Sequence, residues 1–418
     1  MTQPVPDGAG VPARRAALRL LDAVLRQGRA LDHALPAATK GIARADDRAL
    51  AHAIAAEALR RLPDLDALID SATRKRLPDD AKARFALRIA LVQALALHTP
   101  GHAAIATVLP LVDGGPRKLV HGVFGTLMRR GAVLPAPPSL PRNVALRWAE
   151  AWGRAMVDGA GAAIAAPPPL DLTVKPGAIA PEGAVLAPGH VRVAAADVTA
   201  LPGFAEGGWW VQDLAASLPA RLLGPGDGRQ VIDLCAAPGG KTMQLCATGW
   251  QVTALEQVPA RLERLRDNLE RTQLSAELVA ADVMQWAPAA PADAVLLDAP
   301  CSATGIFRRH PDVLHRVRAK DIAALAEVQA AMLARAADWV RPGGTLVYAT
   351  CSLEPAEGEA QISAFLAARG DYRPAPVAAT ELPAGIIPAD GFVRTLPGML
   401  ADAGGLDGFF VARMIRQD

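Results

Sequence analysis

Apolar side chains recur every three or four positions through residues 12–131, the spacing that places them along one face of a helix. Strand-like alternation is absent here, and proline or glycine interrupts the pattern at Pro63, Pro78, Pro100 with Gly101, and Gly114, Gly115 and Pro116. We therefore predict an all-α domain over residues 1–134. Its clearest apolar stripes are Leu18, Leu21 and Leu25, then Leu50, Ile54 and Leu59, and then Leu119, Val123 and Leu127.

From residue 206 onward, short apolar runs alternate with amphipathic segments, as they do in a doubly wound parallel sheet. We expect strands over 231–234, 252–255, 278–280, 294–297, 345–349 and 409–414. Helices are expected over 242–247, 259–271, 321–340 and 357–368, with a turn at 341–344 that leads into the fifth strand. The last strand would lie at an edge or run in reverse. These elements predict an α/β, Rossmann-like domain over residues 206–418.

The segment between these two domains is harder to interpret. Residues 135–141 contain four prolines and form a predicted linker. Residues 142–205 have little periodicity, with one helix expected near 144–156 and a strand at Leu170–Val174. We treat 142–205 as a small linker subdomain whose fold the pattern does not define. Three domains suit a chain of 418 residues, which is long for a single core.

The net charge of +2 hides an uneven distribution along the chain. Residues 1–140 carry 20 Lys and Arg against 12 Asp and Glu, a balance of +8, whereas residues 141–418 carry 24 against 30, a balance of −6. A basic helical domain joined to an acidic remainder is typical of a nucleic-acid-binding module attached to a second activity. A solvated, arginine-rich surface would give the same balance, so charge alone leaves both interpretations open.

Composition narrows the class of protein further. Hydrophobic residues make up 51% and charged residues 21%, which is typical of a folded globular protein. Four cysteines are too few for a disulfide framework, and none lies in a Cys-x-x-Cys pair or a His cluster, so we expect no metal site. Residues 1–10 lack a secretion signal, and no charge-free run is long enough to span a membrane. We expect a cytoplasmic protein.

The first expected strand runs into a glycine-containing loop, Asp233-Leu234-Cys235-Ala236-Ala237-Pro238-Gly239-Gly240-Lys241-Thr242. A phosphate-binding P-loop would need glycine at Cys235, and G-x-G-x-x-G fails because Gly239 and Gly240 are adjacent. An S-adenosylmethionine site fits better, since this ligand has no phosphate. Glu256, after the second strand, could accept hydrogen bonds from ribose hydroxyls, and Asp282, after the third, could bind the adenine amino group.

Two cysteines occupy matching places about fifty residues apart. Asp298-Ala299-Pro300-Cys301-Ser302 and Ala349-Thr350-Cys351-Ser352 each follow an apolar strand. Because loops at the carboxyl ends of parallel strands converge on one crevice, both thiols can face one substrate. Either cysteine taken alone could instead be a small buried hydrophobe.

Together these blocks resemble the motif set of the RNA 5-methylcytosine methyltransferases. Gly305 and Arg308-Arg309-His310-Pro311-Asp312 extend the second block as that family does, and the helical domain is similar to the antitermination factor NusB. This combination is found in the bacterial branch that modifies small-subunit (16S) ribosomal RNA. The resemblance implies a NusB-like RNA-binding domain, an RNA-contacting segment at 142–205, and a monomeric methyltransferase that uses S-adenosylmethionine.

The resemblance also implies roles for individual residues. Cys351 would be the nucleophile that adds to C6 of a cytosine before C5 is methylated, and Cys301 would resolve the adduct. Asp298 lies where its carboxyl group could hydrogen-bond or protonate N3 of the base. The positions that resemble the family's cofactor contacts are Cys235, Ala236, Ala237, Pro238, Gly239, Gly240, Lys241, Glu256, Asp282 and Asp298.

Three alternatives remain open from the sequence. The same chemistry could act on another RNA, such as tRNA. The helical domain could make the chain a non-catalytic RNA-binding protein, although the intact cysteines and glycine loop argue against that. A cysteine hydrolase would need a histidine beside its nucleophile, and only His310 and His315 lie near this region of the sequence.

Overall fold

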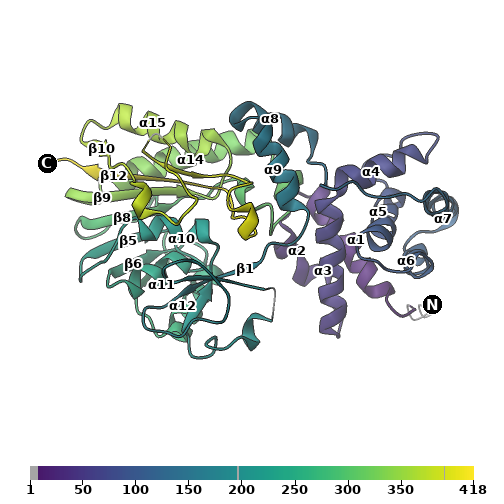
Figure 1. Ribbon diagram of the computed structural model, residues 1–418, viewed down its shortest axis with the longest axis horizontal. Helices are drawn as coiled ribbons and strands as arrows, with labels where there is room; N and C mark the ends of the chain where they lie inside the picture. The colour runs from purple at the N-terminus through teal and green to yellow at the C-terminus, as the bar shows by residue number, and fades with distance from the viewer. Residues whose placement is uncertain (1–7, 195–196, 390) are drawn as a thin grey trace. The chain divides into compact units, whose positions relative to one another are not determined.

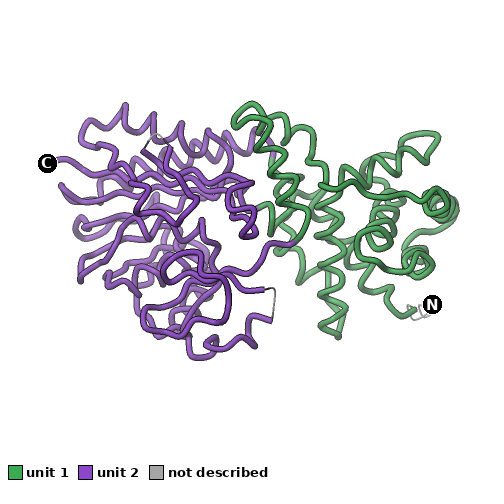
Figure 2. Tube along the Cα trace, viewed as in Figure 1, with its two compact units in different colours: residues 1–166, 307–317 green, residues 167–306, 318–418 purple. Residues whose placement is uncertain are grey.

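The computed structural model describes residues 8–194, 197–389 and 391–418. The chain divides into two compact units (Figure 2). Unit 1 comprises Met1–Ala166 and Phe307–Val317, and unit 2 comprises Pro167–Ile306 and Arg318–Asp418. None of the helices in the described ranges is long and apolar enough to cross a membrane.

Unit 1 is built from helices, as predicted (Figure 1). A single apolar core, which includes Leu20, Leu21, Ile54 and Leu87, joins its first seven α-helices. In chain order its elements are α1 (Val11–Leu25), α2 (Leu31–Ala38), α3 (Ala45–Arg60), α4 (Leu62–Ser71), α5 (Lys82–Leu95), α6 (Gly101–Val108), η1 (Leu109–Leu111), α7 (Gly114–Arg129), α8 (Arg142–Trp152), α9 (Arg154–Ile164) and α13 (Val313–Arg316).

Two details of the helical prediction are corrected. Leu119 is 37% exposed, because α7 turns Val120, Phe124 and Leu127 toward the core instead. The helix expected near 144–156 is two helices, because Gly153 adopts a φ of 81° and ends α8 before α9 begins. A positive φ is readily available to glycine and interrupts a right-handed helix.

Unit 2 contains a mixed sheet in the order β10-β12-β9-β8-β5-β6-β7, with β11 paired to β12. Strands β9, β8, β5, β6 and β7 are parallel, and β12 runs antiparallel to β9. The strands are β5 (Gln230–Leu234), β6 (Gln251–Leu255), β7 (Glu277–Val279), β8 (Ala292–Asp298), β9 (Val340–Thr350), β10 (Tyr372–Pro374), β11 (Val393–Thr395) and β12 (Phe409–Arg416).

Helices cover both faces of this sheet (Figure 1). Successive residues of a strand point to opposite faces, so Leu296 packs in one apolar cluster and Leu297 in the other. One face carries α10 (Leu214–Arg221), α11 (Gly240–Ala247) and α12 (Pro259–Thr272). The other carries α14 (Ala319–Ala337) and α15 (Glu359–Ala368). The predicted α/β, Rossmann-like class is therefore confirmed.

Two features of the sheet differ from the prediction. The expected turn at 341–344 lies within β9, where the ladder to β8 shifts register between the Ala292–Val340 and Ala294–Thr345 pairs and accommodates the extra residues. The last strand is reversed, but β10 lies outside it, so it is not at the edge. Strands as short as β10 and β11 give little periodic signal.

A second, smaller sheet precedes the large one. It is antiparallel, in the order β2-β3-β1-β4, with β1 (Leu170–Val174), β2 (Ala184–Ala187), β3 (His190–Val193) and β4 (Trp209–Val211). Residues 142–205 thus contribute α8 and α9 to unit 1 and β1, β2 and β3 to unit 2. The division into three domains stays a prediction.

Candidate active site

The site lies where the strand order of the large sheet reverses. From β5 the chain moves outward to β6 and β7, and then returns to place β8 and β9 on the other side of β5. The loops after β5 and β8 therefore diverge and leave a crevice at the carboxyl ends of these strands, which is where ligands bind in open α/β sheets. The glycine loop follows β5, and Cys301 follows β8.

The glycine loop turns sharply between β5 and α11. Cys235 has a φ of 60°, and Gly239, just before α11, has a φ of 106°. A Cβ atom on Gly239 would lie only 2.2 Å from Cδ1 of Leu265 in α12. Glycine is therefore required at this position, both for its backbone conformation and for the close packing of α12.

A cavity of about 400 Å³ brings together most of the predicted side chains. Its walls include Cys235, Glu256, Asp282, Asp298, Cys301 and Cys351, all within unit 2. Glu256 follows β6, Asp282 follows β7, Asp298 ends β8 and Cys351 follows β9. Five strand ends thus supply the walls of one cavity.

Glu256 has one buried oxygen that accepts no hydrogen bond from the described residues. Its side chain is 3% exposed, and Oε1 accepts a hydrogen bond from the backbone N–H of Val258 at 3.0 Å. Oε2 lies 3.2 Å from Nη1 of Arg261, but it makes no hydrogen bond with any described residue. A buried carboxylate oxygen in this state favours a ligand that donates hydroxyl groups, such as a ribose.

Asp282 is partly engaged by its own turn. Its Oδ1 accepts a hydrogen bond from the backbone N–H of Met284 at 2.9 Å, and Oδ2 lies 3.5 Å from Nε2 of Gln285. The first bond fixes the orientation of the carboxylate at the rim of the cavity.

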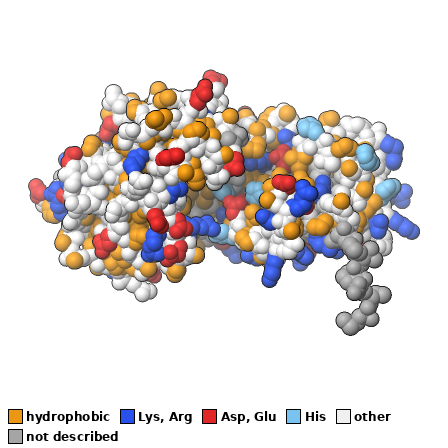
Figure 3. All heavy atoms as spheres, turned by 90° about the horizontal axis from the view of Figure 1, so that it is seen from below, with side chains coloured by type: hydrophobic (Ala, Val, Ile, Leu, Met, Phe, Trp, Pro, Cys, Tyr) orange, Lys and Arg blue, Asp and Glu red, His pale blue; other side chains and the backbone are white. Residues whose placement is uncertain are grey.

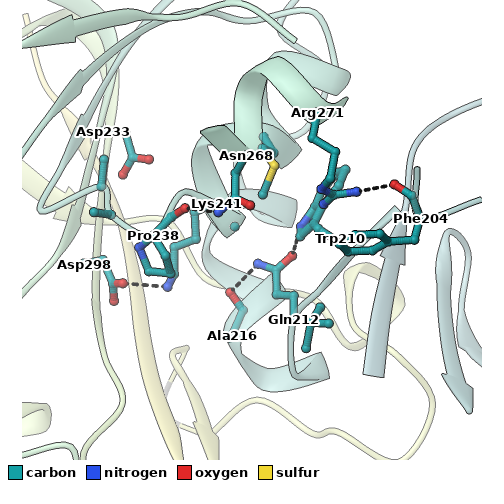
Figure 4. A pocket seen from close by; sticks show the side chains of 15 residues that line it. Phe204, Trp210, Gln212, Ala216, Asp233, Pro238, Lys241, Asn268, Arg271 and Asp298 are labelled. Carbon is teal, nitrogen blue, oxygen red and sulfur yellow. Dashed lines mark hydrogen bonds and ion pairs between the residues drawn. The ribbon is translucent and has the colours of Figure 1, made fainter. Parts of the chain in front are cut away.

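A second cavity, of about 320 Å³, lies against the same glycine loop (Figure 4). Asp298 lines both cavities, and Lys241 lines the second. Lys241 Nζ binds Asp298 Oδ2 at 2.6 Å, as the dashed line in Figure 4 shows. Burial by itself would lower the pKa of Lys241, but the Asp298 carboxylate and the nearby Cys351 outweigh burial and raise it. Lys241 is therefore a cation in this site.

Asp233 lies behind the loop and was not predicted as a site residue. It is fully buried, and Oδ2 accepts a hydrogen bond from Thr242 Oγ1 at 2.6 Å, whereas Oδ1 bonds to none of the described residues. Burial raises the pKa of Asp233 to about 7. A single acid within the short apolar run 231–234 gives no sign in the sequence that this group is buried.

The two predicted thiols are in contact. Sγ of Cys301 lies 3.5 Å from Sγ of Cys351. The hydrogen bond to Cys351, followed by burial, raises the pKa of Cys301 well above its ordinary value. The other two cysteines differ: burial raises the pKa of Cys235 to about 12, and Cys246 donates to the backbone oxygen of Ser275 at 3.2 Å.

The histidines that a cysteine hydrolase would use have other partners. Within unit 1, Nδ1 of His310 lies 3.3 Å from Oδ2 of Asp32, and Nε2 of His315 lies 2.7 Å from the backbone oxygen of Leu59. Burial lowers the pKa of His315 to about 4. Among the described residues, no His, Cys, Asp or Glu side chains are grouped so that they could hold a metal ion.

Comparisons with known proteins agree with this architecture. The family model described as 16S rRNA methyltransferase RsmB/F matches residues 220–415, and the NusB family model matches residues 11–125. A ribosomal RNA small subunit methyltransferase B of Xanthomonas campestris is 37% identical over 403 residues, covering 89% of this chain and 91% of that protein. The protein of the same name from Klebsiella pneumoniae is 35% identical, covering 97% of this chain and 98% of that protein.

Solved structures share the fold. The crystal structure of PH0851 has a TM-score of 0.74 at 22% identity and covers 100% of both chains. NSun6 from Pyrococcus horikoshii, solved with SFG, has a TM-score of 0.58 at 18% identity and covers 67% of this chain and 99% of that one. Near-complete coverage by relatives at this level of identity, with both family models matched in order, shows that the chain belongs to the RsmB/F family of 16S ribosomal RNA methyltransferases, which use S-adenosylmethionine.

Proposed function

We propose that this methyltransferase modifies C5 of a cytosine in 16S ribosomal RNA through a covalent bond between Cys351 and C6 of the base. The observation that carries the proposal is the contact between the two thiols, 3.5 Å apart, at the cavity that also holds Glu256. The proposed setting is a cytoplasmic monomer that acts on ribosomal RNA.

The residues of the cavity fit S-adenosylmethionine. We assign the ribose hydroxyls to Oε2 of Glu256, which accepts no hydrogen bond from the described residues, and the adenine amino group to Asp282. The amino-acid part is assigned to the loop formed by Cys235, Ala236, Ala237, Pro238, Gly239, Gly240 and Lys241. When bound, the cofactor supplies an electrophilic methyl group.

C5 of cytosine is a poor nucleophile, so the base must first be activated. Addition of the Cys351 thiolate to C6 gives C5 enamine character and divides one difficult step into easier ones. Lys241 and Cys351 are close enough to interact electrostatically, because Cys351 is among the groups that raise the pKa of Lys241. The base must leave its stack to be approached from its face, so single-stranded or splayed-out RNA is the expected substrate.

Negative charge that develops on the ring needs a partner at N3. We assign this to Asp298 together with Lys241, because their 2.6 Å ion pair presents both a carboxylate and a proton donor. The sequence alone indicates only Asp298 for this role and predicts Lys241 as a cofactor contact.

After methyl transfer, Cys301 removes the C5 proton, and the bond between Cys351 and C6 then breaks. The hydrogen bond that the Cys301 thiol donates to Cys351, burial and the charge of Cys351 all raise the pKa of Cys301. Once Cys351 is bonded to carbon, it can neither share a proton with Cys301 nor carry a charge beside it. Cys301 therefore becomes easier to deprotonate at the step that needs a base.

The test compares alanine variants of the two cysteines. Cys351→Ala should give neither methylated RNA nor a covalent complex, whereas Cys301→Ala should accumulate protein bonded to methylated RNA, visible as a slow band on a denaturing gel. The double variant should lose that band. If Cys351→Ala were the variant that traps RNA, the roles would be reversed, and normal turnover by both single variants would exclude the two-thiol mechanism.

A further inference from the structure

A buried polar network lies behind both cysteines. Ser302 and Ser352 directly follow Cys301 and Cys351, and both are buried. Their hydroxyl groups meet at Glu357, the last residue of η4 (Pro355–Glu357), whose side chain is fully buried. Oε2 of Glu357 accepts hydrogen bonds from Oγ of Ser302 and, at 2.5 Å, from Oγ of Ser352. One carboxylate oxygen therefore joins the two cysteine loops.

Glu357 itself is held from two further directions. Oε1 accepts from the backbone N–H of Ser302 at 2.9 Å and from Nε2 of Gln329, in α14, at 3.0 Å. The backbone oxygen of Glu357 accepts from the hydroxyl groups of Tyr348 and Thr350, in β9, at 2.8 and 3.2 Å. The carboxylate thus has four donors, all of them neutral, which satisfies a group that can only accept.

Direct contacts also join the two cysteine loops. The backbone N–H of Gly305 donates to the oxygen of Cys351 at 2.9 Å, and that of Leu353 donates to Oγ1 of Thr304 at 3.0 Å. Beside the thiols, Oγ of Ser302 lies 3.2 Å from Oγ of Ser352, and Oγ1 of Thr304 lies 3.4 Å from the same atom. The carboxylate of Glu357 bonds to both of those serines, so it is the group best placed to fix the separation of the two sulfur atoms.

We propose that Glu357 is a positioning residue that holds Cys301 and Cys351 at the separation needed to act in turn on one base. The proposal rests on the roles assigned to the two thiols above. Attack at C6 and proton removal at C5 involve adjacent atoms of the same ring, so the two sulfur atoms must stay in fixed relation. A displacement of about 1 Å at such a site can lower the rate about 100-fold.

Thiol oxidation measures the sulfur separation without any RNA. Diamide takes two hydrogen atoms from a pair of neighbouring thiols and leaves a disulfide, so in the full-length protein the Cys301–Cys351 disulfide should form quickly and be identified by peptide mass mapping. For Glu357→Ala we expect the rate of disulfide formation to fall at least about tenfold and kcat for methylation to fall about 10- to 100-fold. KM for S-adenosylmethionine should stay within about twofold, because Glu256 is untouched. Glu381→Ala, which breaks an ion pair with Arg413 elsewhere in unit 2, is the matched control and should oxidise like the wild type.

The conservative variant separates positioning from a loss of fold. In Glu357→Gln, the remaining oxygen can accept from Ser302 N–H and Gln329, while the amide donates to the two serine hydroxyl groups, which can rotate to accept. We expect Glu357→Gln to recover the oxidation rate to within about threefold of the wild type. If Glu357→Ala does not fold, Ser302→Ala, Ser352→Ala and their combination supply the same test, because each removes one end of the bridge. The double variant should then be no slower than the slower single variant.

The outcomes are distinct. The positioning role would be overturned if folded Glu357→Ala, or the serine variants, formed the disulfide at the wild-type rate. It would also be overturned if Glu357→Ala lost oxidation rate and cofactor affinity to the same extent. If the wild type formed no adduct with RNA while Glu357→Ala still oxidised slowly, the proposed reaction would fail and the positioning of the thiols would stand.

Discussion

Three acids end or follow strands of the large sheet, yet each is engaged differently. Oε2 of Glu256 lies 3.2 Å from Arg261 but accepts no hydrogen bond from the described residues, Asp282 binds a backbone N–H of its own turn, and Asp298 pairs with Lys241. An oxygen without a hydrogen bond can accept one from a ligand, whereas the Asp298 carboxylate is already hydrogen-bonded to Lys241 and acts together with it. Residue type and spacing are similar in the three cases, so the surrounding donors decide what each acid can do.

Replacing Glu256 with alanine should weaken the binding of S-adenosylmethionine by about 1.5–3 kcal/mol, the range for hydrogen bonds to a charged group. Isothermal titration calorimetry would measure the loss, and affinity for RNA should hardly change. Glu277→Ala provides a control, since Glu277 is an exposed acid at the start of β7 that accepts a hydrogen bond from Thr253 in the middle of β6. Unchanged cofactor affinity in Glu256→Ala would remove this residue from the ribose site.

Replacing Lys241 with methionine should slow adduct formation at the cytosine about 100-fold or more, because it removes both the cation near Cys351 and the proton donor paired with Asp298. RNA containing 5-fluorocytosine makes the adduct persist, so a denaturing gel can follow its formation with time. Lys241→Arg keeps the charge and should lose less. Equal rates for Lys241→Met and the wild type would show that Lys241 serves the cofactor or the fold only.

At the scale of elements, the small sheet depends on one buried ion pair. Arg192 in β3 binds Asp171 in β1 through two hydrogen bonds, of 2.6 and 2.8 Å, and Asp171 also accepts from the backbone N–H of Leu214 at the start of α10. Burial alone would raise the pKa of Asp171, but hydrogen bonds from Arg192 and His190 lower it to about 2. This pair ties the small sheet to the first helix of the large one.

Asp171→Asn should therefore cost about 3–5 kcal/mol of unfolding free energy at pH 7, since it leaves the Arg192 charge buried without a partner. In the wild type the pKa is lower in the folded state than the unfolded value of about 3.9, so the pair stabilises above pH 4 and loses this contribution as pH falls toward 2. Urea unfolding at pH 7, 4 and 3 measures the free energies of unfolding of the wild type and of Asp171→Asn. Their difference should be smaller at pH 3 than at pH 7 by about 1 kcal/mol. A difference that is constant with pH would contradict the assignment.

At the scale of the whole molecule, the basic residues behind the +8 charge balance of residues 1–140 are of two kinds. Some arginines are structural, such as Arg84 and Arg88, which are buried and pair with Asp66. Others are exposed, and Figure 3 shows Lys and Arg side chains gathered on the visible face of unit 1. The exposed cations of α7 and its end are Arg117, Lys118, Arg129 and Arg130.

Deletion of residues 1–140 would be a poor test of RNA binding. Phe307–Val317 belongs to the helical unit. There Phe307 packs at a tilted angle against Trp148, with ring centroids 5.4 Å apart, and Asp312 accepts a hydrogen bond from the backbone N–H of Leu31 at 3.4 Å. Removing the first helices would expose this buried segment and confuse binding with misfolding. Charge substitutions in the complete chain avoid the problem.

Replacing Arg117, Lys118, Arg129 and Arg130 with glutamine should weaken RNA binding. The slope of log binding constant against log salt concentration should become shallower by up to about 3, because each contact with a single-strand phosphate contributes about 0.7. Fluorescence anisotropy at several salt concentrations would measure the slope, and cofactor binding should not change. Lys320→Gln and Arg373→Gln, two exposed cations of unit 2, serve as the control. An unchanged slope would mean that these cations do not contact phosphate.

The sequence by itself determined the elements and the chemistry that follows directly from residue type. Helical spacing over 12–131, apolar runs ending in Glu256, Asp298 and Cys351, and the glycine loop all depend on short stretches of chain, where backbone preferences and side-chain periodicity act locally. Only the tertiary structure placed the two sulfur atoms 3.5 Å apart, paired Lys241 with Asp298, and buried Glu357 between Ser302 and Ser352. Except for the contact between Glu357 and Ser352, which are five residues apart, these contacts join residues that are distant in the sequence. Their energies come from burial and hydrogen-bond geometry, which exist only once the strands are assembled side by side.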